Sequence, residues 1–169
     1  SGFDVLDVFT DYDDQYLMIE ARPAAGAAPE RFEAQNATKT LEQVSTFSEK
    51  VVQRLRGWRD LLHDLSANNK KAVIWGSGSK GVAFLTTLDV ASEIAYAVDI
   101  NPHKHGTFMA GTGHEIVGPD FLRQYKPDVV IVMNPIYRDE IQRDLIELGL
   151  SPNLIMIDQA TEFEALDDR

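Results

Sequence analysis

The residues best suited to chemistry lie in one glycine-rich stretch, G-S-G-S-K-G, at residues 76–81. It has the pattern G-x-G-x-x-G and stands between an apolar, strand-like run and a helix-like pattern. In such a motif Gly76 would allow a tight turn, and Gly78 would allow an anionic group to approach the backbone. Gly81 would allow the helix to pack closely on the strand. The helix N-terminus would offer N–H groups and a positive dipole end to a phosphate. We expect a nucleotide or phosphate ligand here; a glycine turn kept for packing alone is the alternative.

Further polar side chains follow the other strand-like runs, and Asp99 stands near the usual place of a ribose-binding acid. Since the carboxyl ends of parallel strands meet at one edge of a sheet, these side chains should converge on a single rim. We expect Asp158 to lie there as well. The candidate residues for binding a phosphate or a nucleotide-linked sugar are Gly76, Ser77, Gly78, Ser79, Lys80, Gly81, Asp99, Asn101, Asn134 and Tyr137.

The elements that must position these residues form an α/β repeat. Buried-strand patterns cover residues 71–75, 94–98, 128–133 and 154–157, and an amphipathic helix is expected over 137–148 with Gly149 after it. Strands that are apolar on both faces and alternate with helices predict a parallel sheet. We therefore expect a Rossmann-like sheet with flanking helices over residues 70–169, with ligands at the edge where the strand order reverses.

Several other polar residues could take part in chemistry. Lys80 could add charge for a phosphate or be a solvated lysine at a helix start. His103, His105 and His114 lie in a glycine-rich stretch that could close over a ligand, but no strong metal spacing is present. Exposed loop histidines are favoured over a metal site or substrate contacts. Glu140 could join Tyr137 as a polar site group or belong to a plain surface. No catalytic residue and no metal ligand is predicted.

Composition narrows the classes of function. The chain has 169 residues, 44% of them hydrophobic, and no cysteine, which rules out disulfides and fits a reducing cytoplasm. The net charge of −11 belongs mostly to the two ends, and no basic stripe supplies the attraction that duplex nucleic acid needs. No apolar run is long enough to span a bilayer. We expect a cytoplasmic protein that binds neither nucleic acid nor membrane.

The N-terminal part has a different character. Strand-like runs at 3–9 and 15–21 around a polar connector predict a hairpin. Since an isolated hairpin is marginal in water, we expect residues 1–22 to complete a sheet of an upstream domain, making the chain a piece of a longer protein; packing on the body is the alternative. Residues 23–39 should be a linker. A capping box at Thr40–Gln43 and apolar residues at steps of three and four predict a helix over 40–69 that packs one face on the next domain.

The body resembles the C-terminal domain of SAM-dependent sugar C-methyltransferases. The resemblance rests on G-S-G-S-K-G at 76–81, V-D-I-N-P-H-K at 98–104, G-T-G-H-E-I-V-G-P at 111–119 and P-D-V-V-I-V-M-N-P-I-Y-R-D-E-I at 127–141. The start of the chain is similar to the final strand pair of a class I methyltransferase domain. These likenesses imply methyl transfer to a carbon of a nucleotide-linked keto-deoxysugar in deoxysugar or antibiotic biosynthesis.

The resemblance also implies a division of labour. SAM and zinc would be bound by upstream domains, and the present chain would help to hold the nucleotide-linked sugar and be inactive alone. SAM-binding motifs usually carry an acidic residue close to the glycine turn. Here Trp75 precedes the glycine loop, which argues against SAM as its ligand. Two other functions stay open: half of a nicotinamide-dependent oxidoreductase, and a non-catalytic docking domain with a degenerate nucleotide-binding fold.

Overall fold

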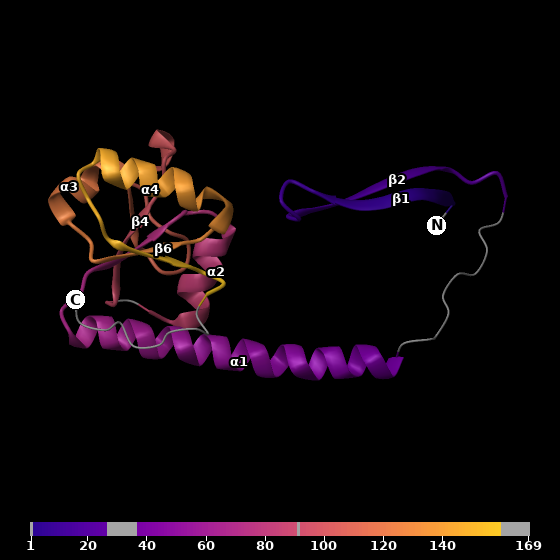
Figure 1. Cartoon of the computed structure of the whole chain (residues 1–169), viewed down its shortest axis with the longest axis horizontal. Coiled ribbons are helices and arrows are strands. Elements are labelled where there is room, and N and C mark those ends of the chain that lie inside the picture. Colours follow the sequence, from indigo (N-terminus) through magenta and orange to yellow (C-terminus); the bar gives the residue numbers. More distant parts are fainter. Residues whose placement is uncertain (1, 27–36, 91, 160–169) are drawn as a thin grey trace. The chain divides into compact units, whose positions relative to one another are not determined.

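The computed structural model describes residues 2–26, 37–90 and 92–159 (Figure 1). The chain forms two compact units, Ser1–Ser45 and Thr46–Arg169. Most of the predicted linker at 23–39 lies outside the described residues. Within the residues that are described, no helix is both long enough and apolar enough to cross a membrane.

The first unit contains the predicted hairpin. Strands β1 (Phe3–Asp11) and β2 (Tyr16–Pro23) pair in antiparallel fashion, with an irregularity between Val5 and Asp7. The polar connector turns sharply, because Tyr12, Asp13 and Asp14 all adopt positive φ angles. Nearly every side chain of both strands is exposed. The antiparallel hairpin is therefore confirmed.

The long amphipathic helix is α1 (Ala37–Ala67). The helix begins at Ala37, three residues before Thr40, so the predicted N-cap position was wrong. Alanine favours a helix, and no residue at 37–39 is a helix breaker. Its end agrees with the expectation, because Asn69 adopts φ 54° and the Lys70 N–H donates to the Leu65 carbonyl at 2.8 Å.

The second unit is built on a five-stranded parallel sheet, and its strand order is β5-β4-β3-β6-β7. This order, with the first strand central and the chain winding outward on both sides, is that of a Rossmann-like fold. Its strands are β3 (Ala72–Trp75), β4 (Ile94–Val98), β5 (Glu115–Val117), β6 (Val129–Val132) and β7 (Asn153–Met156). The helices of this unit that follow α1 are α2 (Ser79–Leu88), α3 (Leu122–Tyr125) and α4 (Arg138–Glu147), besides short 3-10 turns.

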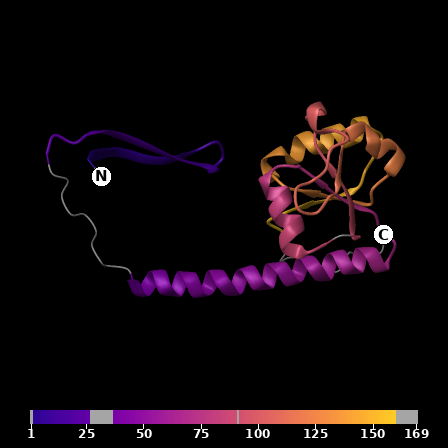
Figure 2. The ribbon, with the colours of Figure 1, turned by 180° about the vertical axis from the view of Figure 1, so that it is seen from behind.

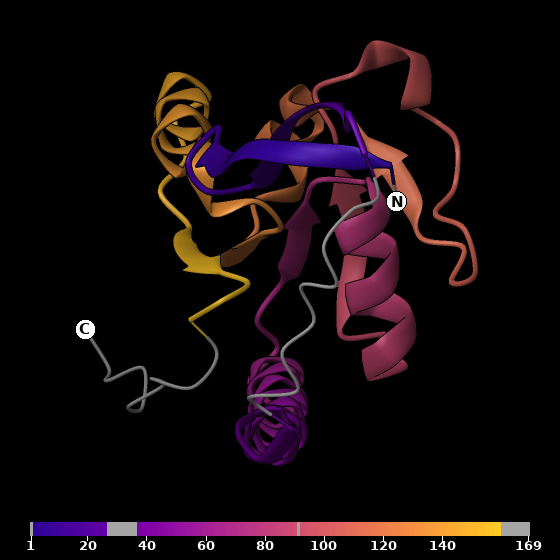
Figure 3. The ribbon, with the colours of Figure 1, turned by 90° about the vertical axis from the view of Figure 1, so that its right-hand side faces the viewer.

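Helices cover both faces of this sheet, as Figures 2 and 3 show from two further directions. Successive strand residues point to opposite faces, so Ile74 of β3 joins one apolar cluster and Trp75 joins the other. The first cluster includes the C-terminal half of α1 and one side of α2, where Trp58 and Phe84 meet edge to face at 5.0 Å. The second includes α3 and α4. Burial on both faces explains why these strands read as continuous apolar runs.

Two expectations needed correction. The stretch between β4 and β6 is not all loop, because Glu115–Val117 forms the edge strand β5 beside β4, and Met109 is buried. Within the described residues the apolar face of α1 is unevenly covered, because Leu62 is fully buried whereas Leu41 is 70% exposed.

Candidate functional site

The polar residues predicted to converge do follow strands that lie side by side. The strand order reverses at β3, which has β4 on one side and β6 on the other. The glycine loop follows β3, Asp99 follows β4, and Asn134 follows β6. Since all three strands are parallel, these segments leave the same edge of the sheet, where ligands of such folds bind.

Two glycines of the loop are required by the backbone. Gly76 has φ 121°, and a Cβ there would lie 3.0 Å from the Met133 Cβ. A Cβ on Gly81 would lie 2.3 Å from the Gly76 carbonyl oxygen and 3.2 Å from Ile74. Gly81 thus allows α2 to pack closely on β3, as the motif predicts.

Gly78 differs from the other two glycines. It is the N-cap of α2, makes no side-chain cap hydrogen bond, and would place a Cβ in open space with nothing within 4 Å. The first intrahelical bond is made by the Val82 N–H to the Gly78 carbonyl. The preceding N–H groups of the first turn therefore have no partner four residues back in the helix. Open space beside these donors is what an anion needs.

Asp99 forms the polar centre of the neighbouring β4 edge. Its Oδ2 accepts hydrogen bonds from the Ser77 N–H at 3.2 Å, from the Ser77 hydroxyl, and from Lys104 Nζ at 2.9 Å. Its Oδ1 accepts from the Asn101 N–H at 2.9 Å. Burial alone would raise the pKa of Asp99, but the bonds from Ser77, Asn101 and Lys104 outweigh it and hold the pKa at about 2. The carboxylate is ionised at neutral pH.

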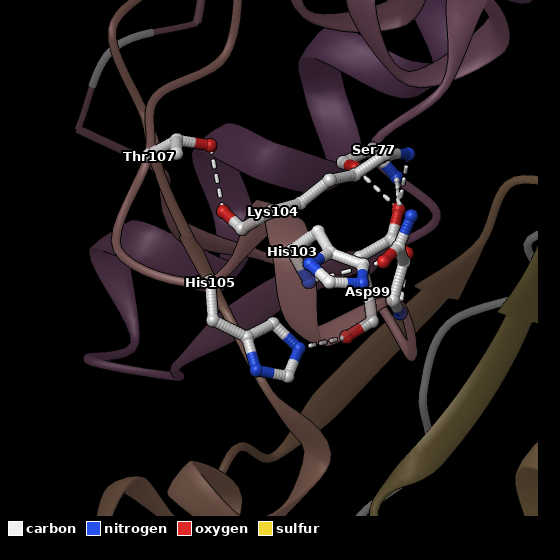
Figure 4. Close-up of polar contacts among 7 residues, drawn as sticks. Ser77, Asp99, His103, Lys104, His105 and Thr107 are labelled. Carbon is white, nitrogen blue, oxygen red and sulfur yellow. Dashed lines mark hydrogen bonds and ion pairs between the residues drawn. The ribbon is translucent and has the colours of Figure 1, made fainter.

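Figure 4 shows how Lys104 and His105 surround this acid. The Lys104 side chain runs toward Ser77 and the carboxylate, while His105 turns to the backbone. His105 Nε2 lies 2.7 Å from the Asp99 carbonyl oxygen, and because a carbonyl only accepts, this nitrogen donates. A Cβ on Gly118 would lie 2.6 Å from the His105 ring, so the ring fills the space that this glycine leaves. Prediction from sequence omitted Lys104, although the spacing D-x-N-P-x-K places it one short turn after Asp99.

On the other side of the loop, Lys80 approaches the end of β6. Its Nζ lies 3.4 Å from Asn134 Oδ1. This contact bridges the segments that follow β3 and β6, which is where the strand order reverses. Tyr137 is 41% exposed just beyond Asn134.

Three other candidates have plainer surroundings. The Asn101 side chain caps the turn at Pro102–Lys104 by accepting from the His103 N–H at 3.0 Å. Glu140 is exposed on α4, and Asp158 is exposed after β7. Within the described part of the chain, neither of the last two residues contacts the glycine loop.

The histidines do not cluster. His103 and His105 are exposed, but the expectation was wrong for His114, which is 6% exposed beside β5. Its Nδ1 lies 2.9 Å from the Thr112 hydroxyl. Burial lowers the pKa of His114, and the backbone of Ile94 offsets this in part. Among the described residues, no group of three or more His, Cys, Asp or Glu side chains could hold a metal ion.

Comparison with known protein families adds an independent finding. Residues 23–149, three quarters of the chain, match the family described as the C-methyltransferase C-terminal domain. The chain belongs to this family. The family resemblance inferred from the motifs is thereby confirmed, and a C-terminal domain of this kind implies a methyltransferase partner domain. A search of curated proteins found no match.

Solved structures add only distant likenesses. RSP, described as a Rex-family repressor, is 17% identical over 52% of this chain, with a TM-score of 0.39. The chain likewise spans about half of that structure, 52% of it. RSP in complex with β-NADH is 14% identical over 67% of this chain and 88% of that one, with a TM-score of 0.41. At these values the likeness assigns no ligand to the present chain.

Proposed function

We propose that this domain binds a nucleotide-linked keto-deoxysugar and positions it for a SAM-dependent C-methyltransferase. The diphosphate of the sugar nucleotide lies against the first turn of α2, at Gly78. The observation that supports this most strongly is the open N-terminus of α2 at the point where the strand order reverses, with a lysine beside it. Backbone N–H groups and the helix dipole favour a phosphate there.

The chemistry of the parent enzyme is divided in this proposal. Methyl transfer to carbon needs a base that forms an enolate next to a ketone and a sulfonium aligned for attack. We assign both to a partner methyltransferase domain, to which residues 1–22 contribute the last strand pair, and we expect SAM and zinc to bind outside the present chain. The exposed apolar side chains of the hairpin support this assignment, because such a pair is marginal alone.

The present chain has little that fits either cofactor. Zinc sites commonly use cysteine, and the sequence has none. Trp75, the last residue of β3 before the loop, is apolar and 6% exposed, where a SAM motif would carry an acid nearby. What the chain offers instead is an anion-binding edge that can hold a substrate in place. We therefore expect the parent to act on sugar nucleotides in deoxysugar or antibiotic biosynthesis, in the cytoplasm.

Isothermal titration calorimetry tests the proposal directly. The wild-type chain should bind thymidine diphosphate and thymidine diphosphate glucose, and it should not bind SAM or NAD at similar concentrations. Binding of NAD alone would favour the oxidoreductase alternative. If none of the four compounds binds, the docking-domain alternative would replace the proposal.

A further inference from the structure

The residue that stands where a ribose-binding acid is expected is engaged mainly by donors of the protein itself. Both Asp99 oxygens already accept hydrogen bonds from the protein, Oδ2 from Ser77 and Lys104 and Oδ1 from the Asn101 N–H. The carboxylate is also only 11% exposed. The remaining acceptor capacity is on Oδ1, which takes one bond from the protein, and the burial of the side chain restricts the access of a ribose hydroxyl to it. Because the donors outweigh the burial that would raise its pKa, they stabilise the charged carboxylate, and displacing one costs free energy.

The group that does face outward is the partner of this acid. The Lys104 side chain is 40% exposed, almost four times the exposed fraction of the Asp99 side chain. An ammonium has three N–H donors. Asp99 Oδ2, at 2.9 Å, and the Ser77 hydroxyl, at 3.2 Å, account for two of them. One N–H donor is then left for a ligand beside the glycine loop.

The backbone around Lys104 is fixed as firmly as its side chain. Its N–H donates to the Asn101 carbonyl at 3.0 Å, and its carbonyl accepts from the Thr107 hydroxyl at 2.6 Å. These bonds hold the turn that carries Lys104, and Figure 4 shows the side chain extended from it to Ser77. A lysine held in this way loses less side-chain entropy on binding than one that is solvated.

We propose that Lys104 is the second cation of the diphosphate site and that Asp99 is a positioning residue for it, not a ribose ligand. This inference rests on the proposed function and names the recognition at the same site. Lys104 approaches the loop from the β4 side through Ser77, and Lys80 stands on the β6 side beside Asn134. The two lysines flank the backbone donors at Gly78, and together they match the two negative phosphates of a nucleoside diphosphate. It follows that the site recognises the diphosphate. Its affinity should not depend on whether the pentose of the nucleoside carries a 2′-hydroxyl.

The test uses three probes on the full chain: inorganic pyrophosphate, thymidine diphosphate, and 5-methyluridine diphosphate, which adds only the 2′-hydroxyl. Wild type should bind the two nucleotides with affinities equal within about twofold. Lys104→Gln should weaken all three probes by a similar factor of about ten, the loss expected for one charge-assisted hydrogen bond. Lys104→Arg should recover most of the affinity. Lys70→Gln is the matched control, because this substitution removes the same charge at a position away from the loop. Lys70 precedes β3 and pairs with Asp128.

Asp99→Asn separates positioning from ribose binding. Our inference requires this variant to change the affinity for pyrophosphate and for both nucleotides by the same factor. A selective loss of 5-methyluridine diphosphate would make Asp99 a ribose ligand and overturn the inference. Unchanged affinity in Lys104→Gln, with the variant folded by circular dichroism, would also overturn it. If wild type binds none of the three probes, the proposed function itself fails, and that result is distinct from either of the others.

Discussion

The two sheets of this chain both carry large apolar side chains, but those side chains differ sharply in exposure. β1 and β2 carry large apolar residues such as Ile19, which is 60% exposed, whereas Ile131 of β6 is fully buried. The five-stranded sheet has helices on both faces, and the large apolar side chains of the hairpin are exposed. A strand-like sequence therefore predicts the strand but not what covers it. The exposed apolar side chains of β1 and β2 agree with our assignment of the hairpin to a partner domain.

The sharpest way to break this comparison is a matched pair of substitutions. Ile131→Ala should lower the free energy of unfolding of the second unit by about 2–5 kcal/mol, because it leaves a cavity in the core. Ile19→Ala should change it by no more than about 0.5 kcal/mol. Urea denaturation followed by tryptophan fluorescence measures the right unit, since both tryptophans, Trp58 and Trp75, are buried in its core. Equal losses in the two variants would show that the hairpin belongs to the same cooperative core.

The next effect compares two glycines of one loop. Gly81→Ala should destabilise the second unit by about 1–3 kcal/mol, because its Cβ would lie 2.3 Å from a backbone oxygen. Gly78→Ala meets nothing within 4 Å and should cost less than about 1 kcal/mol, as expected for an N-cap glycine. Thermal melting of both variants checks this. Similar melting temperatures would mean that α2 does not pack on β3 as closely as described.

The smallest effect concerns pH. Because burial lowers the pKa of His114, the unfolded chain takes up a proton near pH 6.5 and the folded chain does so only at lower pH. The free energy of unfolding should therefore be constant above that pH and fall as the pH drops below it. His114→Gln should flatten this slope, and His103→Gln, at an exposed position, should not. A slope that survives in His114→Gln would assign the pH dependence to another group.

Much of the fold was accessible from sequence because the strands of the central sheet are apolar on both faces. The limits of β4 agree with the prediction, and the close packing at Gly81 follows from its motif. The strand β5 could not be found, because its three residues stand among glycines and are held by pairing with β4. Such a strand is a product of tertiary contact, not of local pattern.

The site shows a similar limit. Sequence spacing predicted Asp99 at the carboxyl edge of the sheet. It could not show that the Lys104 ammonium forms an ion pair with this acid. That ion pair depends on the turn that begins at Asn101 and Pro102. In α1 the apolar pattern extends evenly from Leu41, and among the described residues the C-terminal half of the helix joins the apolar core. Helical periodicity identifies a face and cannot say how much of it is covered.

The central claim is that the N-terminus of α2 holds the diphosphate of an activated sugar. Amide nuclear magnetic resonance of the full chain, titrated with thymidine diphosphate, tests it most directly. The largest shifts should fall on the amides of Gly78, Ser79 and Lys80, and Gly78→Val should abolish binding while the protein stays folded. Shifts centred elsewhere, or unchanged affinity in Gly78→Val, would contradict the account.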